Sequence, residues 1–469
     1  MNTDHSMRNG VTRREFVGMC GASVAMAATG TIAGGPEARL PEYYDAYLKP
    51  RIDRISALAA KCVDGFTFLT DIHVPANCRR SGLLCGKIVE ATGLKKVLFG
   101  GDLPEAFGGR ESIDRTIAEY RRKWVDAIES AGGEFYAAKG NHDFTIRADP
   151  EAQSGFTYPG EYAKSVLMDT RAIRANAVVN GEDPECCYYY FDNPKAKLRY
   201  IVADTTDTVD QRRTWWAVAL GMHERQLLWL AEHALAEMPE GFGAIIMHHI
   251  PVVGVVGEDK EVEIFDKWRQ VMEAYQNRGC VTLFGRTFDY STAKGKILFD
   301  LTGHHHAERE TFQRGIWHMT QPCDARYRDY IDRAKPWCPD LPEKTPGTVY
   351  EHTMDVIQVD SCAHLLHFTR IGGGGNRTFH LECRSATVGV ELPFATHNLG
   401  GDISWGCYDA DRAAKRQHPT RRYHAFYDYF NDVADISPDG KLRPKKPGEC
   451  VVVALAADGD KEIFAVKVS

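Results

Sequence analysis

The most constraining feature of this 469-residue sequence is a repeated pattern of short apolar runs, each ending at Gly, Asp, Asn or His. The runs have the length of buried strands and cover residues 66–69, 96–99, 134–138, 199–203, 243–247 and 297–302. The charged segments between them have helical spacing and include residues 85–92, 113–130, 224–237 and 261–277. Strands that alternate with helices predict a layered α/β domain.

The pattern changes after Gly303, where the helical spacing fades. The later strands are expected at residues 355–359, 365–370, 388–392, 403–405, 450–456 and 462–468. Residues 188–191 and 198–203 flank an Asp-Asn-Pro turn and predict a hairpin. The glycines at 372–375 are followed by no helix, so they predict a turn between strands rather than a phosphate-binding loop.

The composition is that of an ordinary globular protein, with 43% hydrophobic and 26% charged residues. The formal net charge of −7 and the lack of a long basic block disfavour a nucleic-acid partner. Beyond the N-terminal segment no apolar run is long enough to predict a transmembrane helix. None of the thirteen cysteines forms a Cys-x-x-Cys pair, so a cysteine zinc site is not expected. Cys186–Cys187 and Cys78/Cys85 could form disulfides outside the cytoplasm, or remain buried thiols.

The N-terminal segment has the features of a twin-arginine export signal. Thr-Arg-Arg-Glu-Phe-Val at residues 12–17 precedes a stretch rich in Gly and Ala that ends near Gly35. We therefore expect residues 1–35 to be a signal, cleaved after Ala27 or Ala33, and the protein to be periplasmic or extracellular. The alternative is an ordinary flexible terminus that happens to contain two arginines.

Polar motifs stand where five of the apolar runs end. They are Asp71-Ile72-His73, Gly100-Gly101-Asp102, Gly140-Asn141-His142-Asp143, His248-His249-Ile250-Pro251 and Gly303-His304-His305-His306. Because open α/β sheets bind ligands beyond the carboxyl ends of their strands, we expect these motifs to converge on one crevice. Imidazole and carboxylate groups suit transition-metal ions, and a carboxylate can bridge two ions about 3.5–4 Å apart. Together, and in this order, the motifs predict a dinuclear metal site.

This order of motifs resembles that of the calcineurin-like metallophosphoesterases: Asp-x-His, Gly-Asp, Gly-Asn-His-Asp/Glu, His and Gly-His-x-His. The resemblance implies a four-layered α/β/β/α sandwich, which we place at residues 64–384 after a helical lead-in at residues 36–63. It implies two transition-metal ions, of Mn, Fe or Zn, as cofactors. The implied ligands are Asp71, His73 and His306 for one ion, Asn141, His249 and His304 for the other, and Asp102 as the bridge.

The resemblance also implies roles beside the metal ions. His142 would be a general acid near the leaving group, and Asp143 would orient its imidazole ring. Purple acid phosphatases of this superfamily carry a tyrosine three residues after the bridging Asp. Glu105 stands there in this sequence, which disfavours the iron–tyrosinate type of centre.

Two neighbouring histidines are not assigned as ligands. Between His248 and His249 we choose His249, because the family's ligand usually precedes an x-Pro pair and Ile250-Pro251 follows it. His305 fills the variable position of Gly-His-x-His and is expected to point away from the metal ions.

The last part of the chain, residues 385–469, resembles a bacterial Ig-like domain. Its Ser437-Pro438-Asp439-Gly440 turn and its Lys446-Pro447-Gly448 turn precede the closing strands, and Trp405 would suit a sandwich core. Such a module could be a spacer or a contact to glycan or the cell surface. The alternative is a β appendage that packs on the catalytic domain.

The sequence thus predicts an exported phosphoesterase that hydrolyses a small phosphomonoester or phosphodiester. Arg110 and the segment 319–350 are candidates for substrate contact, and the segment carries Arg326, Tyr327, Arg328, Tyr330 and Trp337. One alternative is a nuclease-type member, which the acidic charge disfavours. Another is a surface-binding protein with an inactive esterase fold, which the filled ligand positions disfavour.

Overall fold

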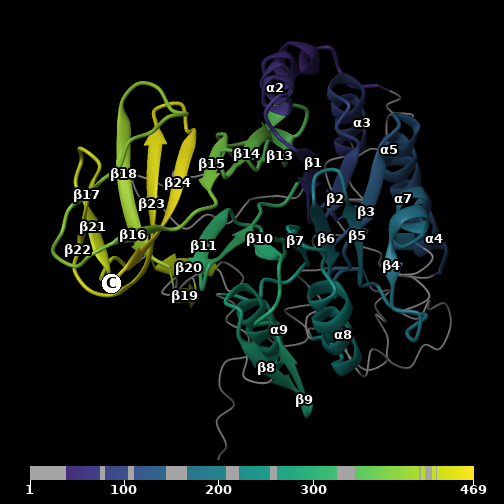
Figure 1. Cartoon of the computed structure of the whole chain (residues 1–469). Coiled ribbons are helices and arrows are strands. Elements are labelled where there is room, and N and C mark those ends of the chain that lie inside the picture. Colours follow the sequence, from purple (N-terminus) through teal and green to yellow (C-terminus); the bar gives the residue numbers. More distant parts are fainter. Residues whose placement is uncertain are drawn as a thin grey trace, which may run out of the picture. The chain divides into compact units, whose positions relative to one another are not determined.

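The larger of the two main β-sheets runs from the strands that precede the first three polar motifs to the C-terminal region (Figure 1). The strands on its path are, in order, β18 (Ile403–Asp409), β23 (Gly448–Ala456), β24 (Lys461–Val468), β15 (Arg377–His380), β14 (Leu365–Gly372), β13 (Thr353–Asp360), β1 (Asp64–Leu69), β2 (Lys96–Phe99) and β3 (Glu134–Ala137). A further strand, β16 (Arg384–Ala386), pairs with β24. Strands β1, β2 and β3 are parallel, so the motifs that follow them lie at one edge.

The computed structural model describes residues 39–73, 80–103, 110–143, 166–207, 221–253, 261–324, 344–410, 414–417, 425–428 and 430–469. The predicted signal, Cys78, Glu105 and the five candidate substrate residues between 326 and 337 therefore lie outside the described residues. Arg110 begins a helix, but its side chain is not among those described. Residues 41–469 form one compact unit.

The second sheet contains the remaining motif strands. In order across the sheet they are β11 (Arg309–Gln313), β12 (Ile316–Thr320), β10 (Lys296–Thr302), β7 (Gly243–Met247), β6 (Leu198–Val202), β5 (Tyr189–Asn193) and β4 (Val178–Val179). Strand β7 pairs in parallel with β6 and with β10, and β10 also pairs in parallel with β12. The antiparallel pairing of β5 with β6 confirms the predicted hairpin.

Helices cover the outer face of each sheet, which gives the four layers of the predicted sandwich (Figure 1). Those beside the first sheet are α2 (Tyr43–Ala59), α3 (Ser81–Thr92), α4 (Arg110–Tyr120), α5 (Asp126–Ser130) and α7 (Arg171–Asn176). Those beside the second are α8 (Glu224–Trp229) and α9 (Glu261–Gln276). A π-helical turn at Arg121–Val125 joins α4 to α5. The predicted mixed α/β fold class is confirmed.

Aromatic side chains hold the two sheets face to face. The ring of Phe191 stacks on that of Tyr136 from the first sheet, with centroids 3.8 Å apart, and on Tyr200 on its other side at 4.8 Å. The Tyr189 hydroxyl donates to the carbonyl of Ala137 and accepts from its N–H, both at 3.0 Å. These contacts fix the strand ends of one sheet against those of the other.

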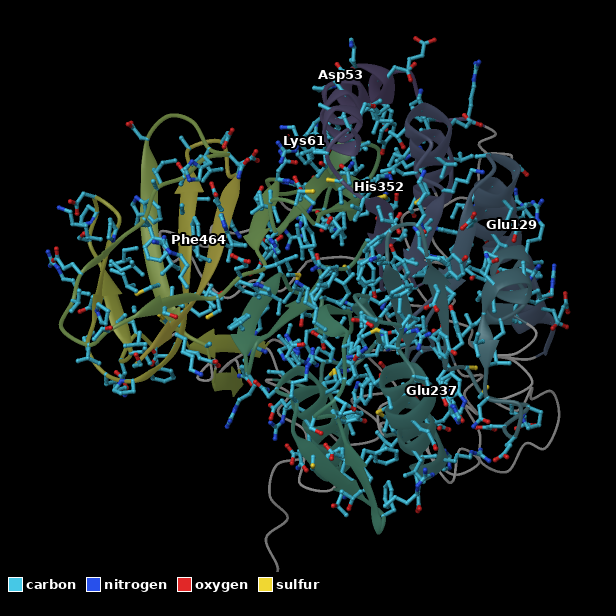
Figure 2. All side chains as sticks on the ribbon, in the orientation of Figure 1. Asp53, Lys61, Glu129, Glu237, His352 and Phe464 are labelled. Carbon is cyan, nitrogen blue, oxygen red and sulfur yellow. The ribbon has the colours of Figure 1, made fainter. Side chains whose placement is uncertain are left out.

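The C-terminal strands are hydrogen-bonded into the first sheet. Strand β24 pairs in parallel with β15, and β18, β23 and β24 continue the sheet as an antiparallel set. A smaller sheet of β17 (Leu392–Pro393), β22 (Lys441–Pro444) and β21 (Ala434–Ile436) covers their apolar face, where Phe464 packs (Figure 2). The arrangement is compatible with a β sandwich. The Ig-like identity and the boundary at residue 385 stay predictions.

Most of the predicted strands are observed within a few residues of their expected bounds, but the strand expected at residues 388–392 is wrong. Only Leu392–Pro393 is extended, because the chain turns at Val388-Gly389, where Gly389 has φ of +78°. Cys85, Cys186 and Cys187 are free thiols. In the part of the chain that the structure describes, no helix is long and apolar enough to cross a membrane.

Candidate metal centre

All seven predicted ligands lie at the carboxyl ends of strands, where the two sheets meet. Asp71 and His73 follow β1, Asp102 follows β2, and Asn141 follows β3; His249 follows β7, and the Gly303–His306 motif follows β10. The first five of these ligands are at most 2% exposed, whereas His304 and His306 are half-buried. The structure therefore brings together every ligand that the sequence predicted.

Five of the seven predicted ligands have a left-handed backbone, which side chains other than glycine rarely adopt. The φ angles are +55° at Asp71, +47° at His73, +56° at Asp102, +67° at His304 and +49° at His306. Each such residue costs about 1–3 kcal/mol and persists only where its surroundings enforce it. Strain concentrated on candidate ligands is typical of a functional site.

The glycines of the motifs are required by close approach. A Cβ on Gly101 (φ +97°) would lie 2.7 Å from His249 Nδ1 and 2.9 Å from the backbone nitrogen of Gly140. A Cβ on Gly303 would collide with the side chains of Thr70 and Asp71. Because any larger residue would push the ligand loops apart, glycine is required at positions 101 and 303.

One group of donors contains Asp71, His73 and His306. His306 Nε2 lies 3.1 Å from Asp71 Oδ1 and 3.3 Å from His73 Nε2. Asp71 is held in place by the Thr70 hydroxyl, which donates to Oδ2 at 2.7 Å, and by the backbone N–H of His304 at 3.1 Å. The three side chains present one oxygen and two nitrogens to a common point.

A second group contains Asp102, Asn141, His249 and His304. The amide oxygen of Asn141 lies 3.1 Å from His249 Nε2 and 2.8 Å from His304 Nδ1. Asp102 Oδ2 lies 3.2 Å from His249 Nε2 and 3.7 Å from His73 Nε2, so it faces a histidine of each group. This is the position that a bridging carboxylate requires.

The chemistry of these donors fits a pair of borderline transition-metal ions. Imidazole nitrogens with carboxylate and amide oxygens are ligands that such ions accept, and thiolates are not needed. The candidate donor atoms lie within 4.8 Å of one another in the groups Asp71-His73-His306 and Asp102-His249-His304. His305 belongs to none of the donor groups found among the described residues, and its predicted orientation away from the metal ions stays a prediction.

Opposite charges inside the centre shift the protonation of its histidines. Burial lowers the pKa of His249, but the carboxylates of Asp102 and Asp71 outweigh burial and raise it to about 9. Burial likewise lowers the pKa of His306, and the Asp71 carboxylate raises it well above the usual value. Burial, together with the charges of His249 and His305, lowers the pKa of His304. In the metal-free protein, His249 and His306 therefore hold protons at neutral pH.

Metal affinity should rise with pH as a consequence. Each proton on His249 or His306 must leave before the ring nitrogen can bind a metal ion, so affinity should increase up to about tenfold per pH unit for each proton released, until pH approaches 9 at His249. Isothermal titration in two buffers of different ionisation enthalpy at pH 7 would measure the protons released. Equal heats in both buffers would contradict the prediction.

His142 lies beside the shared carboxylate. Its Nε2 is 4.0 Å from Asp102 Oδ2, and its backbone N–H donates to Asp102 Oδ1 at 2.7 Å. With 14% of its side chain exposed, the ring lies at the solvent side of the buried Asp102. This is a suitable place for a group that gives a proton to a leaving oxygen.

Asp143 differs from its predicted role. Rather than orienting the His142 ring, its carboxylate accepts the backbone N–H groups of Gly140 at 2.7 Å, Asp102 at 3.0 Å and Leu103 at 2.7 Å. The residue is fully buried. Asp143 thus joins the loop after β3 to the loop after β2, which the adjacent sequence positions of His142 and Asp143 did not indicate.

Replacing Asp143 with Ala should destabilise the protein by about 3–5 kcal/mol. The change leaves three buried N–H groups without their acceptor, and each costs about 1–3 kcal/mol, with partial relief from relaxation. Urea unfolding of the metal-free chain would measure the loss, and Asp143→Asn, which keeps one acceptor oxygen, should lose less. A loss below about 1 kcal/mol for the alanine variant would mean that the three bonds do not brace the loops.

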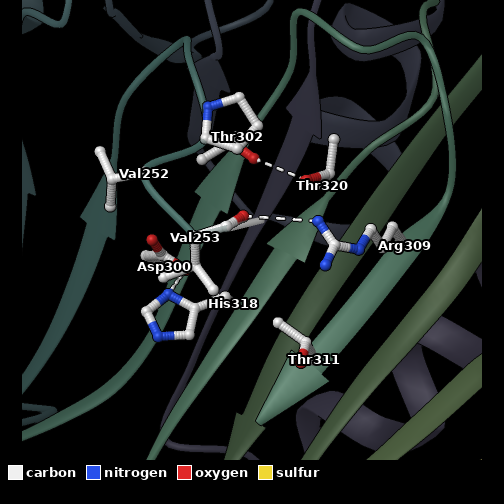
Figure 3. Close-up of a pocket in the computed structure, with 9 residues that line it drawn as sticks. Val252, Val253, Asp300, Thr302, Arg309, Thr311, His318 and Thr320 are labelled. Atoms are coloured by element: carbon white, nitrogen blue, oxygen red, sulfur yellow. Dashed lines mark hydrogen bonds and ion pairs between the residues drawn. The ribbon is translucent and has the colours of Figure 1, made fainter. Parts of the chain in front are cut away.

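His248 points to the other side of the second sheet from His249. Its Nδ1 donates to the carbonyl of Ile250 at 2.9 Å, and its Nε2 lies 3.1 Å from Asp300 Oδ2. Asp300 and His318 line a separate polar pocket with Arg309 and three threonines (Figure 3). Asp300 is paired with Ile246 of the neighbouring strand β7, and the Ile246 side chain packs in the core that α8 and α9 cover. His248 therefore faces the helix-covered side of the sheet. The choice of His249 over His248 therefore agrees with the geometry.

Sequence reasoning missed Cys323, which follows the strand β12. It is fully buried, and its thiol forms a hydrogen bond with His306. The next residue, Asp324, donates its backbone N–H to the carbonyl of Thr70 at 2.8 Å. The apolar run of β12 just ahead of Cys323 was the available signal. Because β12 is parallel to β10, the carboxyl end of β12 reaches the same edge of the sheet.

Comparison with known proteins places the chain in a family. The family described as calcineurin-like phosphoesterase matches residues 65–307, more than half of the chain. A dimetal phosphatase from Danio rerio is 14% identical, with 68% of this chain and 98% of that chain covered and a TM-score of 0.44. Phosphopantetheinyl hydrolase from Mycobacterium tuberculosis is 12% identical, with coverage of 56% and 91% and a TM-score of 0.26. GAP50, the anchor in the inner membrane complex of Plasmodium, is 9% identical, with coverage of 66% and 84% and a TM-score of 0.34. No curated protein matches the sequence. The family match shows that this chain belongs to the calcineurin-like phosphoesterases.

Proposed function

We propose that the protein is an exported phosphoesterase that hydrolyses small phosphomonoesters or phosphodiesters at a pair of transition-metal ions of Mn, Fe or Zn. The observation that carries this proposal is the pair of donor groups that share Asp102, with His142 beside them. Donors in this arrangement suit in-line displacement at phosphorus, where both the attacking and the leaving oxygen need stabilisation. Export is proposed from the Arg-Arg segment at residues 12–17.

The chain's own residues would act as follows. When bound, the metal pair supplies positive charge to the phosphate oxygens and lowers the pKa of water. Asp102 would bridge the two ions, and Asp71, Asn141 and the histidines His73, His249, His304 and His306 would hold them. His142 Nε2 gives its proton to the departing alkoxide, and Asp143 keeps the His142 loop in place through the backbone.

Metal analysis combined with two chromogenic esters tests the proposal. Residues 36–469 contain the whole compact unit and would be assayed for metal content and for hydrolysis of p-nitrophenyl phosphate and bis-p-nitrophenyl phosphate. We expect about two ions per chain and turnover of at least one ester, and the preferred ester assigns mono- or diesterase activity. A folded chain without metal or turnover would support a binding protein instead, and cleavage of DNA would support a nuclease.

The export signal is tested separately, by fusing residues 1–35 to a reporter that folds before export. We expect the reporter in the periplasm, and replacement of Arg13 and Arg14 by Lys should keep it in the cytoplasm. A reporter that stays in the cytoplasm with the natural segment would contradict export without affecting the proposed hydrolysis.

A further inference from the structure

A cluster of six charged side chains is buried between the two sheets, close to the metal-binding loop after β10. It contains three acids and three bases, and each residue is at most 8% exposed. The members are Glu308, Glu310, Asp355, Arg370, Arg377 and Lys461. Burial of unpaired charges is costly, so the equal numbers of acids and bases are required for the cluster to exist there.

Glu308 is the centre of this cluster. Its Oε1 lies 2.7 Å from Lys461 Nζ, and its Oε2 lies 2.5 Å from Arg370 Nη2 and 3.3 Å from Arg377 Nη1. The Glu308 carboxylate is therefore fixed from two sides by three cationic side chains.

These contacts connect three parts of the chain to the metal centre. Glu308 comes two residues after His306. Arg370 and Arg377 both bind Asp355 on β13, the strand that pairs with β1 ahead of Asp71. Lys461 is the first residue of β24 in the C-terminal region. The cluster thus attaches the segment that follows His306 to the first sheet, whose strands precede Asp71 and Asp102.

His306 needs such an attachment. It has φ of +49°, so its backbone is strained, and it must hold Nε2 within 3.1 Å of Asp71 Oδ1. On its N-terminal side the loop is packed through Gly303 against Thr70 and Asp71. On its C-terminal side, the first ionic contacts come two residues later, at Glu308.

We propose that Glu308 and Lys461 are positioning residues for His306, so that the C-terminal strand β24 forms part of the support of the metal centre. This inference rests on the proposed function only in requiring that the centre binds metal. The simpler view is that the cluster merely stabilises the fold. The two views differ in one measurable respect: a positioning role lowers the affinity of the ion that His306 binds, beyond any general loss of stability.

The test compares the Mn²⁺ affinities of variants on the same strand. Each variant is titrated with Mn²⁺, and binding is measured by calorimetry and by electron paramagnetic resonance, which distinguishes single ions from coupled pairs. Lys461→Met keeps most of the side-chain length but removes the charge. We expect one of the two ions to bind about 10–100-fold more weakly, with the coupled signal replaced by that of single ions. Lys467→Met, on the exposed face of β24, is the matched control and should bind both ions as the natural chain does.

A double variant separates positioning from stability. Lys461→Met with Glu308→Gln removes one charge of each sign, so the cluster stays balanced and the melting temperature should exceed that of either single variant. The ionic contact between residues 308 and 461 is still missing in the double variant, so the ion that His306 binds should remain weakly bound. Two ions bound by the folded double variant with natural affinity would overturn the inference, even if Lys461→Met alone fails to fold. A natural chain that binds no metal would instead overturn the proposed function.

Discussion

Asp102→Ala is expected to abolish paired metal binding and to lower kcat/KM by about 10³-fold or more. Asp102 Oδ2 faces His249 at 3.2 Å and His73 at 3.7 Å, whereas Asp71, the other buried carboxylate near both donor groups, lies 3.1 Å from His306 and 4.0 Å from His249. Without Asp102, two like-charged ions would repel each other across the site, and the second should bind weakly. Metal content and steady-state hydrolysis of the preferred ester would be measured together.

The effect of Asp102 can be separated from a general loss of structure. Asp102→Asn keeps the side-chain volume and should also lose the pair, because a neutral amide does not offset the charge of two ions. The control Asp360→Asn changes a buried carboxylate at the end of β13 that is farther from the metal centre, and it should leave metal content unchanged. Natural metal content and turnover in Asp102→Ala would rule out the bridging role.

His142→Gln should lower kcat by about 10²–10⁴-fold for esters with alkyl leaving groups. An alkoxide is a poor leaving group unless it receives a proton, and His142 is the partly exposed imidazole beside Asp102 Oδ2. p-Nitrophenolate leaves without a proton, so hydrolysis of p-nitrophenyl esters should fall much less. Rates measured with a series of leaving groups of increasing basicity would show a steeper dependence in the variant.

Two results complete the test of His142. The control His233→Gln changes an exposed histidine paired with Glu237 and should leave both classes of ester unaffected. An equal loss for alkyl and p-nitrophenyl esters in His142→Gln would mean that His142 acts on binding or on the attacking water, and not on the leaving group.

The sequence predicts the parts of the centre that depend on local order. A short apolar run followed by Asp71-Ile72-His73 or Gly303–His306 specifies a strand and a ligand pair at its end, and parallel pairing brings such ends together. For this reason most strands, and the meeting of the motifs at one edge, follow from the sequence, whereas the choice of the seven ligands comes from the family resemblance. His248 and His249 are adjacent, and only the x-Pro pair distinguished them.

What the sequence does not predict depends on contacts between distant segments. The sequence suggests Asp143 as a partner of His142 because the two are neighbours. In the structure, the Asp143 carboxylate instead accepts hydrogen bonds from backbone N–H groups of two loops. Glu308 and Lys461 look like ordinary charged residues in the sequence, and they meet because the segment just ahead of β11, in one sheet, faces the start of β24, in the other. Spacing along the chain carries no information about such a contact.

The separation of the ligands along the chain has a consequence for how the protein matures. His73 and His306 lie 3.3 Å apart in space but are separated by 233 residues, so their approach is a late, high-contact-order event in folding. The ribosome must have made at least 306 of the 469 residues before both sets of donors exist. The full donor set therefore exists only once these distant segments have come together, and competition among ions is decided in the compartment where folding is completed.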